Sequence, residues 1–519
     1  MRALGGLWVL ASTLLVAVGC DGGEAATQAA STGQVAAAPA EAGPTVFSEV
    51  PVTSSNAGAR AAFDKARDLQ LNTREAEAIV ELKKAVEAEP GFAFAHAWLG
   101  YLVPGPEGDI ELAKAMAARA PLPEPERLTI EELAALRGGD RGKARDLARK
   151  VVDLAPFDWR AQLDLANRLY DERKFDDAAL HYGKAAAFGP NTAPVYNALG
   201  YGYLAQHKVD AAVAAFRKYA ELKPDEPNAL DSLGEALMNG GKLPEAEKAF
   251  TDAASRGFTF AWDGVAQTRF LRGDYAGGFE ANARSHDEAP RPNDKIDVDI
   301  IGAWAALAKG DVDDANKRAD AIEKAAQAAK YDEAYAVSST LRGVALAEAG
   351  KEGEAQRELA KAIERGEKAK LPGIAMNRVR RTALTLAAIF GSRAGATADV
   401  EKAAAGLAAD AKASPTDLDL ASLAALGRGA TTLSKGDAKA AMVELAACVD
   451  QDYFCRWELL LAEQKAGDET SASVSRDKLV AMDVRDAPYL YARAKASAPA
   501  AAASPAASVS PSAAPAASR

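Results

Sequence analysis

Residues 193–226 read APVYNALGYGYLAQHKVDAAVAAFRKYAELKPDE, and the spacing of small, aromatic and proline residues in this stretch decides the fold. Its landmarks are Leu199, Gly200, Phe216 and Pro224. Residues of the same chemistry recur 34 positions away on both sides. They are Leu165, Ala166, Tyr182 and Pro190 upstream, and Leu233, Gly234 and Phe250 downstream. A fixed period with matching chemistry predicts a repeated supersecondary unit.

The composition favours helices as the repeated element. Hydrophobic residues make up 49% of the chain and aromatic residues 7%, so the apolar content is largely alanine and leucine, which are strong helix formers. A chain of 519 residues exceeds one ordinary compact core, yet no change in composition divides its middle. We therefore expect an all-α, extended and repetitive architecture.

The 34-residue spacing resembles the tetratricopeptide repeat, a helix-turn-helix unit. In that register Gly200 and Ala212 are the small residues where two helices approach closely, and Tyr203 and Phe216 fill the seams to neighbouring helices. Weaker copies extend in both directions, and GDYAGG, GDVDDA, GKEGEA and GDAKAA mark turns before second helices. The resemblance implies an α-solenoid of about nine to eleven antiparallel helix pairs.

The N-terminus predicts export and lipid attachment. Arg2 precedes an apolar run of 16 residues, shorter than the ~20 that span a bilayer, and small residues follow it. Residues 17–20, AVGC, resemble the lipobox of bacterial lipoproteins, which implies acylation of Cys20. We expect a lipid-anchored protein that faces the periplasm, with inner and outer membrane both open; the alternatives are an uncleaved anchor and ordinary secretion.

Composition and repeat strength divide the chain into segments. Ala, Gly, Ser, Thr and Pro dominate the stretch after Cys20, and the C-terminal stretch is of low complexity. Prolines in LVPGPEGD and PLPEPER predict an irregular corner at 102–127. We expect a signal peptide at 1–19, a lipid-anchored flexible tether at 20–55, divergent repeats at 56–158, core repeats at 159–292, divergent helical repeats at 293–496, and a disordered tail at 497–519.

Few residues suggest chemistry. The four histidines lack the spacing of metal ligands, and Asp294, Asp297 and Asp299 lack the glycine of a calcium loop. Ser475 and Lys478 match S-x-x-K without its companion motifs. We therefore predict no catalytic residue, metal or cofactor.

Two further cysteines remain beside Cys20. Cys448 and Cys455 bracket an expected turn between helices. In an exported protein such a pair forms either a disulfide or two buried free thiols, and the sequence leaves both open.

The resemblance also implies a binding surface, because the first helix of each pair lines the concave face in tetratricopeptide arrays. Carried over to this chain, the groove residues are Arg160, Asn167, Asn197, Tyr201, Asn228, Asp231 and Glu235, together with Leu163, Tyr170, Leu204 and Met238. The family's carboxylate clamp is absent, since Leu163, Ala198 and Ser232 stand at its cationic and amide positions.

These residues favour a non-enzymatic adaptor that binds an extracytoplasmic protein or peptide. The acidic groove around Asp231 and Glu235 suggests a basic or neutral partner. Nucleic acid is not expected, because the net charge is -11 and no basic stripe is present. The alternative is a small-molecule binding protein associated with transport.

Overall fold

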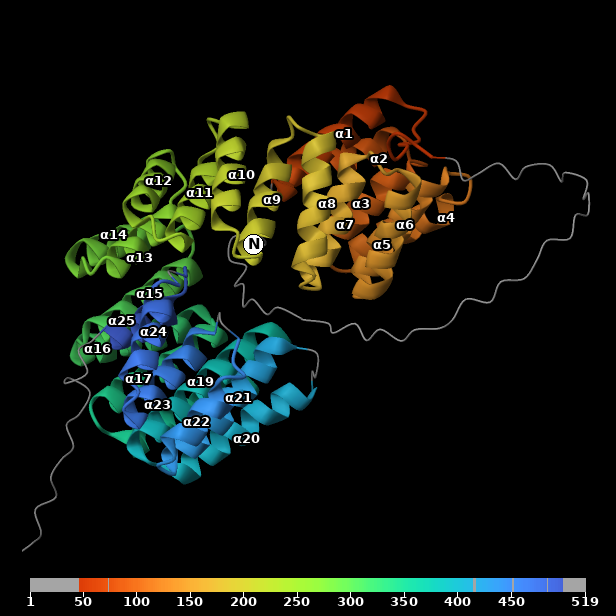
Figure 1. Cartoon of the computed structure of the whole chain (residues 1–519). Coiled ribbons are helices and arrows are strands. Elements are labelled where there is room, and N and C mark those ends of the chain that lie inside the picture. Colours follow the sequence, from red (N-terminus) through yellow and green to blue (C-terminus); the bar gives the residue numbers. More distant parts are fainter. Residues whose placement is uncertain (1–45, 73, 414–416, 450–451, 483, 498–519) are drawn as a thin grey trace, which may run out of the picture. The chain divides into compact units, whose positions relative to one another are not determined.

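The computed structural model describes residues 46–72, 74–413, 417–449, 452–482 and 484–497. Within these ranges every regular element is an α-helix, which confirms the all-α prediction (Figure 1). The helices are α1 Ala57–Leu71, α2 Glu75–Ala88, α3 Ala93–Leu102, α4 Pro106–Ala118, α5 Glu124–Arg137, α6 Arg141–Leu154, α7 Trp159–Asp171, α8 Phe175–Phe188, α9 Ala193–Ala205, α10 Val209–Leu222, α11 Pro227–Asn239, α12 Leu243–Ser255, α13 Ala261–Leu271, α14 Tyr275–Glu288, α15 Pro292–Lys309, α16 Val312–Ala329, α17 Asp332–Glu348, α18 Glu352–Lys368, α19 Gly373–Ala394, α20 Thr397–Ala413, α21 Leu418–Ser434, α22 Ala438–Leu445, α23 Tyr453–Ala466, α24 Glu469–Val480 and α25 Ala487–Ser497.

Successive helices form the expected solenoid of pairs. The described residues hold twelve consecutive pairs, from α1 and α2 to α23 and α24, followed by α25. This is one pair more than the upper end of the expectation, because the divergent stretches also fold as pairs. The chain divides into two compact units: one contains α1–α11 and the end of α12, the other the start of α12 and α13–α25. The predicted boundaries after residues 158 and 292 therefore fall inside the two units.

The glycines of the repeat lie where two helices approach most closely. A Cβ atom built on Gly200 would lie 2.5 Å from the Phe216 ring, and one on Gly234 would lie 2.8 Å from the Phe250 ring. Both phenylalanines are fully buried. The predicted role of Gly200 as the point of closest approach between paired helices is confirmed.

Glycine and aspartate together form the turns that were predicted to open second helices. Gly273 and Gly310 have positive φ angles of 80° and 84°, a conformation that glycine adopts without steric cost. The next residue, Asp274 or Asp311, accepts a hydrogen bond from a backbone N–H in the first turn of α14 or α16. Each Gly-Asp dipeptide thus ends one helix and begins the next.

The expectation of an irregular corner at 102–127 is wrong. Half of that stretch belongs to α4, and α5 begins within it. Pro106 and Pro125 lie in the first turns of these helices. Proline is tolerated there, because the first N–H groups of a helix have no intrahelical partner.

The N-terminal segment also differs from the expectation. We expect residues 46–55 to belong to the flexible tether, but they form a non-helical segment, without bends at 50–54, that is hydrogen-bonded to side chains of the first unit. The signal peptide and Cys20 fall in residues 1–45, outside the described residues, as does the tail from 498 onward. Among the helices that are described, none is both long and apolar enough to cross a membrane.

The second unit is closed by its last helix. α25 packs against α13, α15, α23 and α24, so that it lies beside α15, which begins 195 positions earlier in the chain (Figure 1). Tyr491 of α25 is fully buried, and its ring contacts Trp304, Phe390 and Trp457. Its hydroxyl donates to Glu348, 2.6 Å away. These contacts anchor α25 to helices that come much earlier in the chain.

The two remaining cysteines are joined in the second unit. Cys448 follows α22 and Cys455 lies in the first turn of α23, with Cα atoms 6.1 Å apart, and the structure pairs them as a disulfide. The sequence had left a disulfide and two free thiols open.

Candidate functional site

A hydrogen-bond network joins α9 and α11 on the predicted groove. The Ser232 hydroxyl donates to Asn197 Oδ1, 3.2 Å away, and lies 3.3 Å from the Tyr201 hydroxyl. The Tyr201 hydroxyl is also 3.4 Å from Glu235 Oε2. Asn197, Tyr201 and Glu235 are half-buried, so amide, phenol and carboxylate groups lie together at the surface. The structure brings these three predicted residues together through Ser232.

Two predicted groove asparagines bind tyrosines of the second helices. Asn167 Oδ1 accepts a hydrogen bond from the Tyr182 hydroxyl, 2.8 Å away. The Asn228 side chain donates to the Tyr219 hydroxyl over 3.4 Å. The first bond therefore joins the two helices of one pair, α7 and α8, and the second joins α10 to α11 of the next pair.

The remaining predicted residues are more enclosed. Asp231 is 7% exposed, and Leu163, Tyr170 and Met238 are also buried, whereas Leu204 is half-buried. Burial, with Glu235 nearby, raises the pKa of Tyr170 to about 12. The buried side chains stabilise the helix packing. The half-buried ones, such as Asn197, Tyr201 and Glu235, are those that reach the surface.

A second feature of the first unit is the N-terminal strap, residues 46–55. Its backbone N–H groups donate to side-chain carboxylates: that of Val50 to Asp158 over 2.7 Å, and that of Thr53 to Glu126 over 3.0 Å. The Thr53 hydroxyl adds a bond of 2.6 Å to Glu126. Near its end, the Ser55 N–H donates to Glu89 over 2.9 Å. Three carboxylates thus hold one extended segment.

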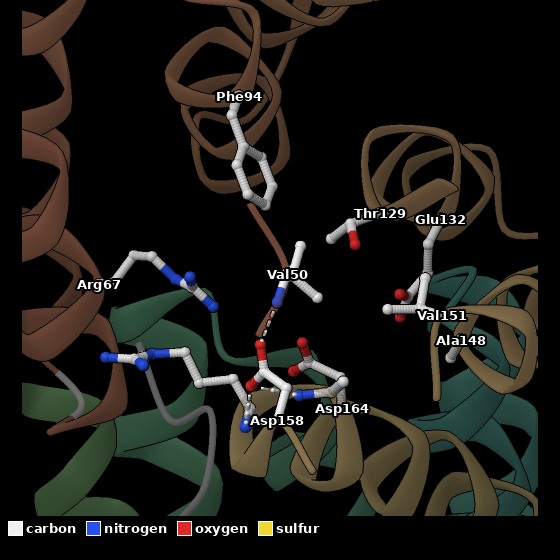
Figure 2. Close-up of a pocket in the computed structure, with 11 residues that line it drawn as sticks. Val50, Arg67, Phe94, Thr129, Glu132, Ala148, Val151, Asp158 and Asp164 are labelled. Atoms are coloured by element: carbon white, nitrogen blue, oxygen red, sulfur yellow. Dashed lines mark hydrogen bonds between the residues drawn. The ribbon is translucent and has the colours of Figure 1, made fainter. Parts of the chain in front are cut away.

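The strap closes a small pocket. Figure 2 shows Val50 between Phe94 of α3 and Asp158 at the start of α7, with Arg67 of α1 approaching from the side. The space left beneath Val50 is about 10 Å³, enough for one water molecule. Val50 also packs against two hydrophobic core clusters of the first unit, one that includes Phe94 and one that includes Leu165.

Charged groups line this pocket. Burial, reinforced by Asp164, raises the pKa of Glu132 to about 8, although Arg168 lies 3.1 Å away. Burial also raises the pKa of Asp164. Burial and the neighbouring Arg160 lower the pKa of Arg67, whose guanidinium faces the ring of Phe94. Predicted groove residue Arg160 belongs here, stacked on the Trp159 ring at 4.3 Å, and not with the α9–α11 network.

The sequence reasoning missed the strap and its carboxylates. Val50 and Val52 alternate with other residues in SEVPVTSS, a weak signal of an extended, half-buried segment. Ala- and Gly-rich residues before them concealed it. The carboxylates of Glu126 and Asp158 carried no signal, because their partners lie 73 and 108 positions away.

In the described part of the chain no group of His, Cys, Asp and Glu side chains is arranged to hold a metal ion. The paired helices, their 34-residue spacing and the glycine contacts define a solenoid of the tetratricopeptide type.

Several solved structures are similar to parts of this chain. The crystal structure of MamA is 19% identical and covers 30% of this chain and 93% of its own, with a TM-score of 0.29. A further MamA structure (AMB-1) is 23% identical over 32% of this chain and 93% of its own, with a TM-score of 0.28. YrrB, described as a TPR protein with an unusual peptide-binding site, is 16% identical over 40% of this chain and 92% of its own, with a TM-score of 0.28. No family model and no curated protein matches the chain.

Proposed function

We propose that this protein is a non-enzymatic scaffold that binds another polypeptide on the exposed face of α9 and α11. The observation that carries the proposal is the network of Asn197, Tyr201, Ser232 and Glu235. Its amide, hydroxyl and carboxylate groups are held in place by one another, and such half-buried polar groups are suited to hydrogen-bond a peptide.

The partner segment is expected to be neutral or basic. Glu235 adds negative charge to this face, and Asp231 lies buried beneath it. An acidic partner would meet like charges there, and like-charge contacts at an interface cost binding energy.

Site-specific photo-cross-linking in intact cells tests the proposal. A photoreactive amino acid replaces Leu204, which is half-buried one turn beyond Tyr201 on α9; the control position is Arg217, exposed on α10. A specific protein adduct should form at position 204 and not at 217. Glu235→Lys should lower its yield at least fivefold. Equal adducts at both positions, or a yield indifferent to Glu235→Lys, would contradict the proposal.

We further propose that the scaffold is anchored in the bacterial envelope through acylated Cys20. The support is the lipobox-like sequence AVGC after a short apolar run. Several acyl chains on one residue give stable attachment, whereas one chain binds only marginally. Cys20→Ser should move the protein from the membrane to the soluble fraction and remove the mass of the lipid. Unchanged fractionation and mass would sink this part of the proposal.

A pocket in the second unit supports a second candidate function, the binding of a small molecule. Its volume is about 330 Å³, within the range of small-ligand sites. Leu459, Val474, Arg456 and Lys478 are among its lining residues. A metabolite that binds there should raise the unfolding temperature of the wild type and not of Val474→Trp, which fills the pocket. If no metabolite in a broad panel raises the unfolding temperature of the wild type, binding of a small molecule at this pocket is excluded.

A further inference from the structure

The strap is held as a bound peptide would be held. Most extended segments in proteins pair with a neighbouring strand, but here the acceptors are side-chain carboxylates that bind backbone N–H groups at Val50, Thr53 and Ser55. Backbone N–H groups are present in any extended segment without proline at those positions. The hydroxyls of Thr53, Ser54 and Ser55 donate to two of the same carboxylates, Glu126 and Glu89. The surface therefore recognises the backbone N–H groups of an extended chain together with hydroxyl side chains at its end.

The carboxylates under the strap need a donor. Glu126 is fully buried, and its hydrogen bonds come from Thr53 of the strap. A buried carboxylate without a hydrogen bond is costly, so departure of the strap favours entry of another N–H donor. Because Glu89, Glu126 and Asp158 are all acidic, the donor segment carries no carboxylate at the positions that contact them. The strap meets this condition, since its one acidic residue, Glu49, is exposed.

The strap itself buries little apolar surface. None of residues 46–55 is fully buried, and Val46 is 58% exposed. The helices beneath it carry fully buried residues such as Phe94, Ile130 and Leu165. Segments with few buried apolar contacts open with a much lower free energy than the core does. Release of the strap is therefore compatible with an intact first unit.

We propose that the surface formed by Glu89, Glu126 and Asp158 is a groove for an extended polypeptide segment without carboxylates at its contact positions. The strap is its intramolecular occupant and is displaced when the partner binds. This inference rests on the proposed scaffold function, and it places a second contact with the partner on α5 and the start of α7. While the strap is bound, the groove is closed to outside segments, because a tethered segment acts at an effective concentration of about millimolar.

The experiment releases the strap in the full-length protein. Val50→Pro with Thr53→Pro removes both N–H donors while keeping an extended backbone. Glu49→Pro is the matched control, because the Glu49 N–H lies in the same segment without a hydrogen bond to these carboxylates. The probe is a fluorescein-labelled peptide with the sequence of residues 46–56, VFSEVPVTSSN. Its binding is measured by fluorescence anisotropy.

The released variant should bind the probe at least tenfold more tightly than the wild type and the Glu49→Pro control. Adding Glu126→Ala to the released variant should weaken binding again, as should the two prolines in the probe. A released variant that keeps its helical circular dichroism but does not bind the probe overturns the inference.

Hydrogen exchange on the wild type covers the case in which the released variant does not fold. The amides of Val50 and Thr53 should exchange at least tenfold faster than those in the middle of α5 and α7. Exchange as slow as in those helices would show that the strap does not open separately from the fold and would overturn the inference.

Cross-linking at position 204 is a separate readout, so failure of the strap inference and failure of the scaffold proposal are distinguishable.

Discussion

At the level of single residues, two helical glycines in the first unit have opposite surroundings. Gly200 of α9 faces the buried Phe216 ring, and a Cβ atom there would approach it to 2.5 Å. Gly183 of α8 has no atom within 4 Å of the place where its Cβ would be. The first glycine is required by packing, whereas the second only weakens its helix.

Alanine substitutions at these glycines should therefore act in opposite directions. Gly200→Ala forces the enclosed Phe216 ring to move and should cost about 1–3 kcal/mol of unfolding free energy. Gly183→Ala should stabilise by about 0.5–1 kcal/mol, because alanine is the better helix former. Urea unfolding of the two variants measures both. Equal effects would mean that helix propensity, and not close approach, explains Gly200.

A buried carboxylate gives the second unit a pH dependence. Glu458 is fully buried; its Oε1 accepts a hydrogen bond from Ser392 over 2.6 Å, and its Oε2 has no partner. Burial raises the pKa of Glu458 to about 7. The folded state therefore holds a proton that the unfolded state, with a carboxyl pKa near 4.5, releases earlier.

The stability contributed by this proton is complete below about pH 4.5 and is lost as the pH rises through about 7. Glu458→Gln stays neutral, so it should reduce the fall in unfolding temperature between pH 5 and pH 8.5 by a few degrees. Part of the fall should remain in this variant, because burial also raises the pKa of Asp486 to about 7. Glu469→Gln, which removes an exposed carboxylate, controls for net charge. If Glu458→Gln follows the wild type across this range, Glu458 does not hold the proton.

At the level of elements, the second helices of the later pairs differ in how they begin. Asp274 caps α14 by accepting a hydrogen bond from the Gly277 N–H over 2.9 Å. Lys351 stands at the same place before α18 and provides no side-chain cap. Both positions are exposed, so packing does not complicate the comparison.

Exchanging the caps should change stability in a predictable direction. Asp274→Ala should cost about 1 kcal/mol, since an N–H of the first turn loses its acceptor. Lys351→Asp should gain up to about 1 kcal/mol, because aspartate both caps the helix and complements its dipole. Thermal unfolding monitored by circular dichroism measures both. A destabilising Lys351→Asp would indicate that Lys351 has a role outside capping.

At the level of the whole molecule, the chain forms two compact units of different character. In the first unit, an extended strap lies on the helices and bonds chiefly to their side chains, with one backbone bond from the Phe47 N–H to the Leu154 carbonyl. In the second, α25 returns to α15 and inserts the fully buried Tyr491 among aromatic residues. The first arrangement is suited to exchange with a partner, and the second is a permanent part of the core.

Removal of the Tyr491 side chain should therefore loosen the second unit alone. Tyr491→Ala deletes a large buried ring and should cost about 3–5 kcal/mol. Tyr491→Phe keeps the ring and loses the hydroxyl, which bonds to Glu348 and interacts with Arg393, so it should cost about 1–2 kcal/mol. Hydrogen exchange should accelerate in α15 and α23 and stay unchanged in α7 and α9. Acceleration in the first unit as well would show that the two units unfold together.

The repeat, the helix pairs and their turns were predictable because their information is local. Gly200 and Phe216 lie 16 positions apart in neighbouring helices, and Gly273 and Asp274 are adjacent, so spacing alone identifies their roles. The half-buried residues of the candidate groove were predictable only as positions on α9 and α11. Their network depends on Ser232, which the repeat pattern does not distinguish from other small residues.

The strap and the closure by α25 could not be read from any spacing. Val50 meets Asp158 across 108 positions, and Tyr491 meets Glu348 across 143. Periodicity records which face of a helix is apolar, and neighbouring helices bury that face in a fixed order. It contains no information about which distant segment fills the space that the stacked helices leave, because that choice depends on the shape and charge of the folded surface.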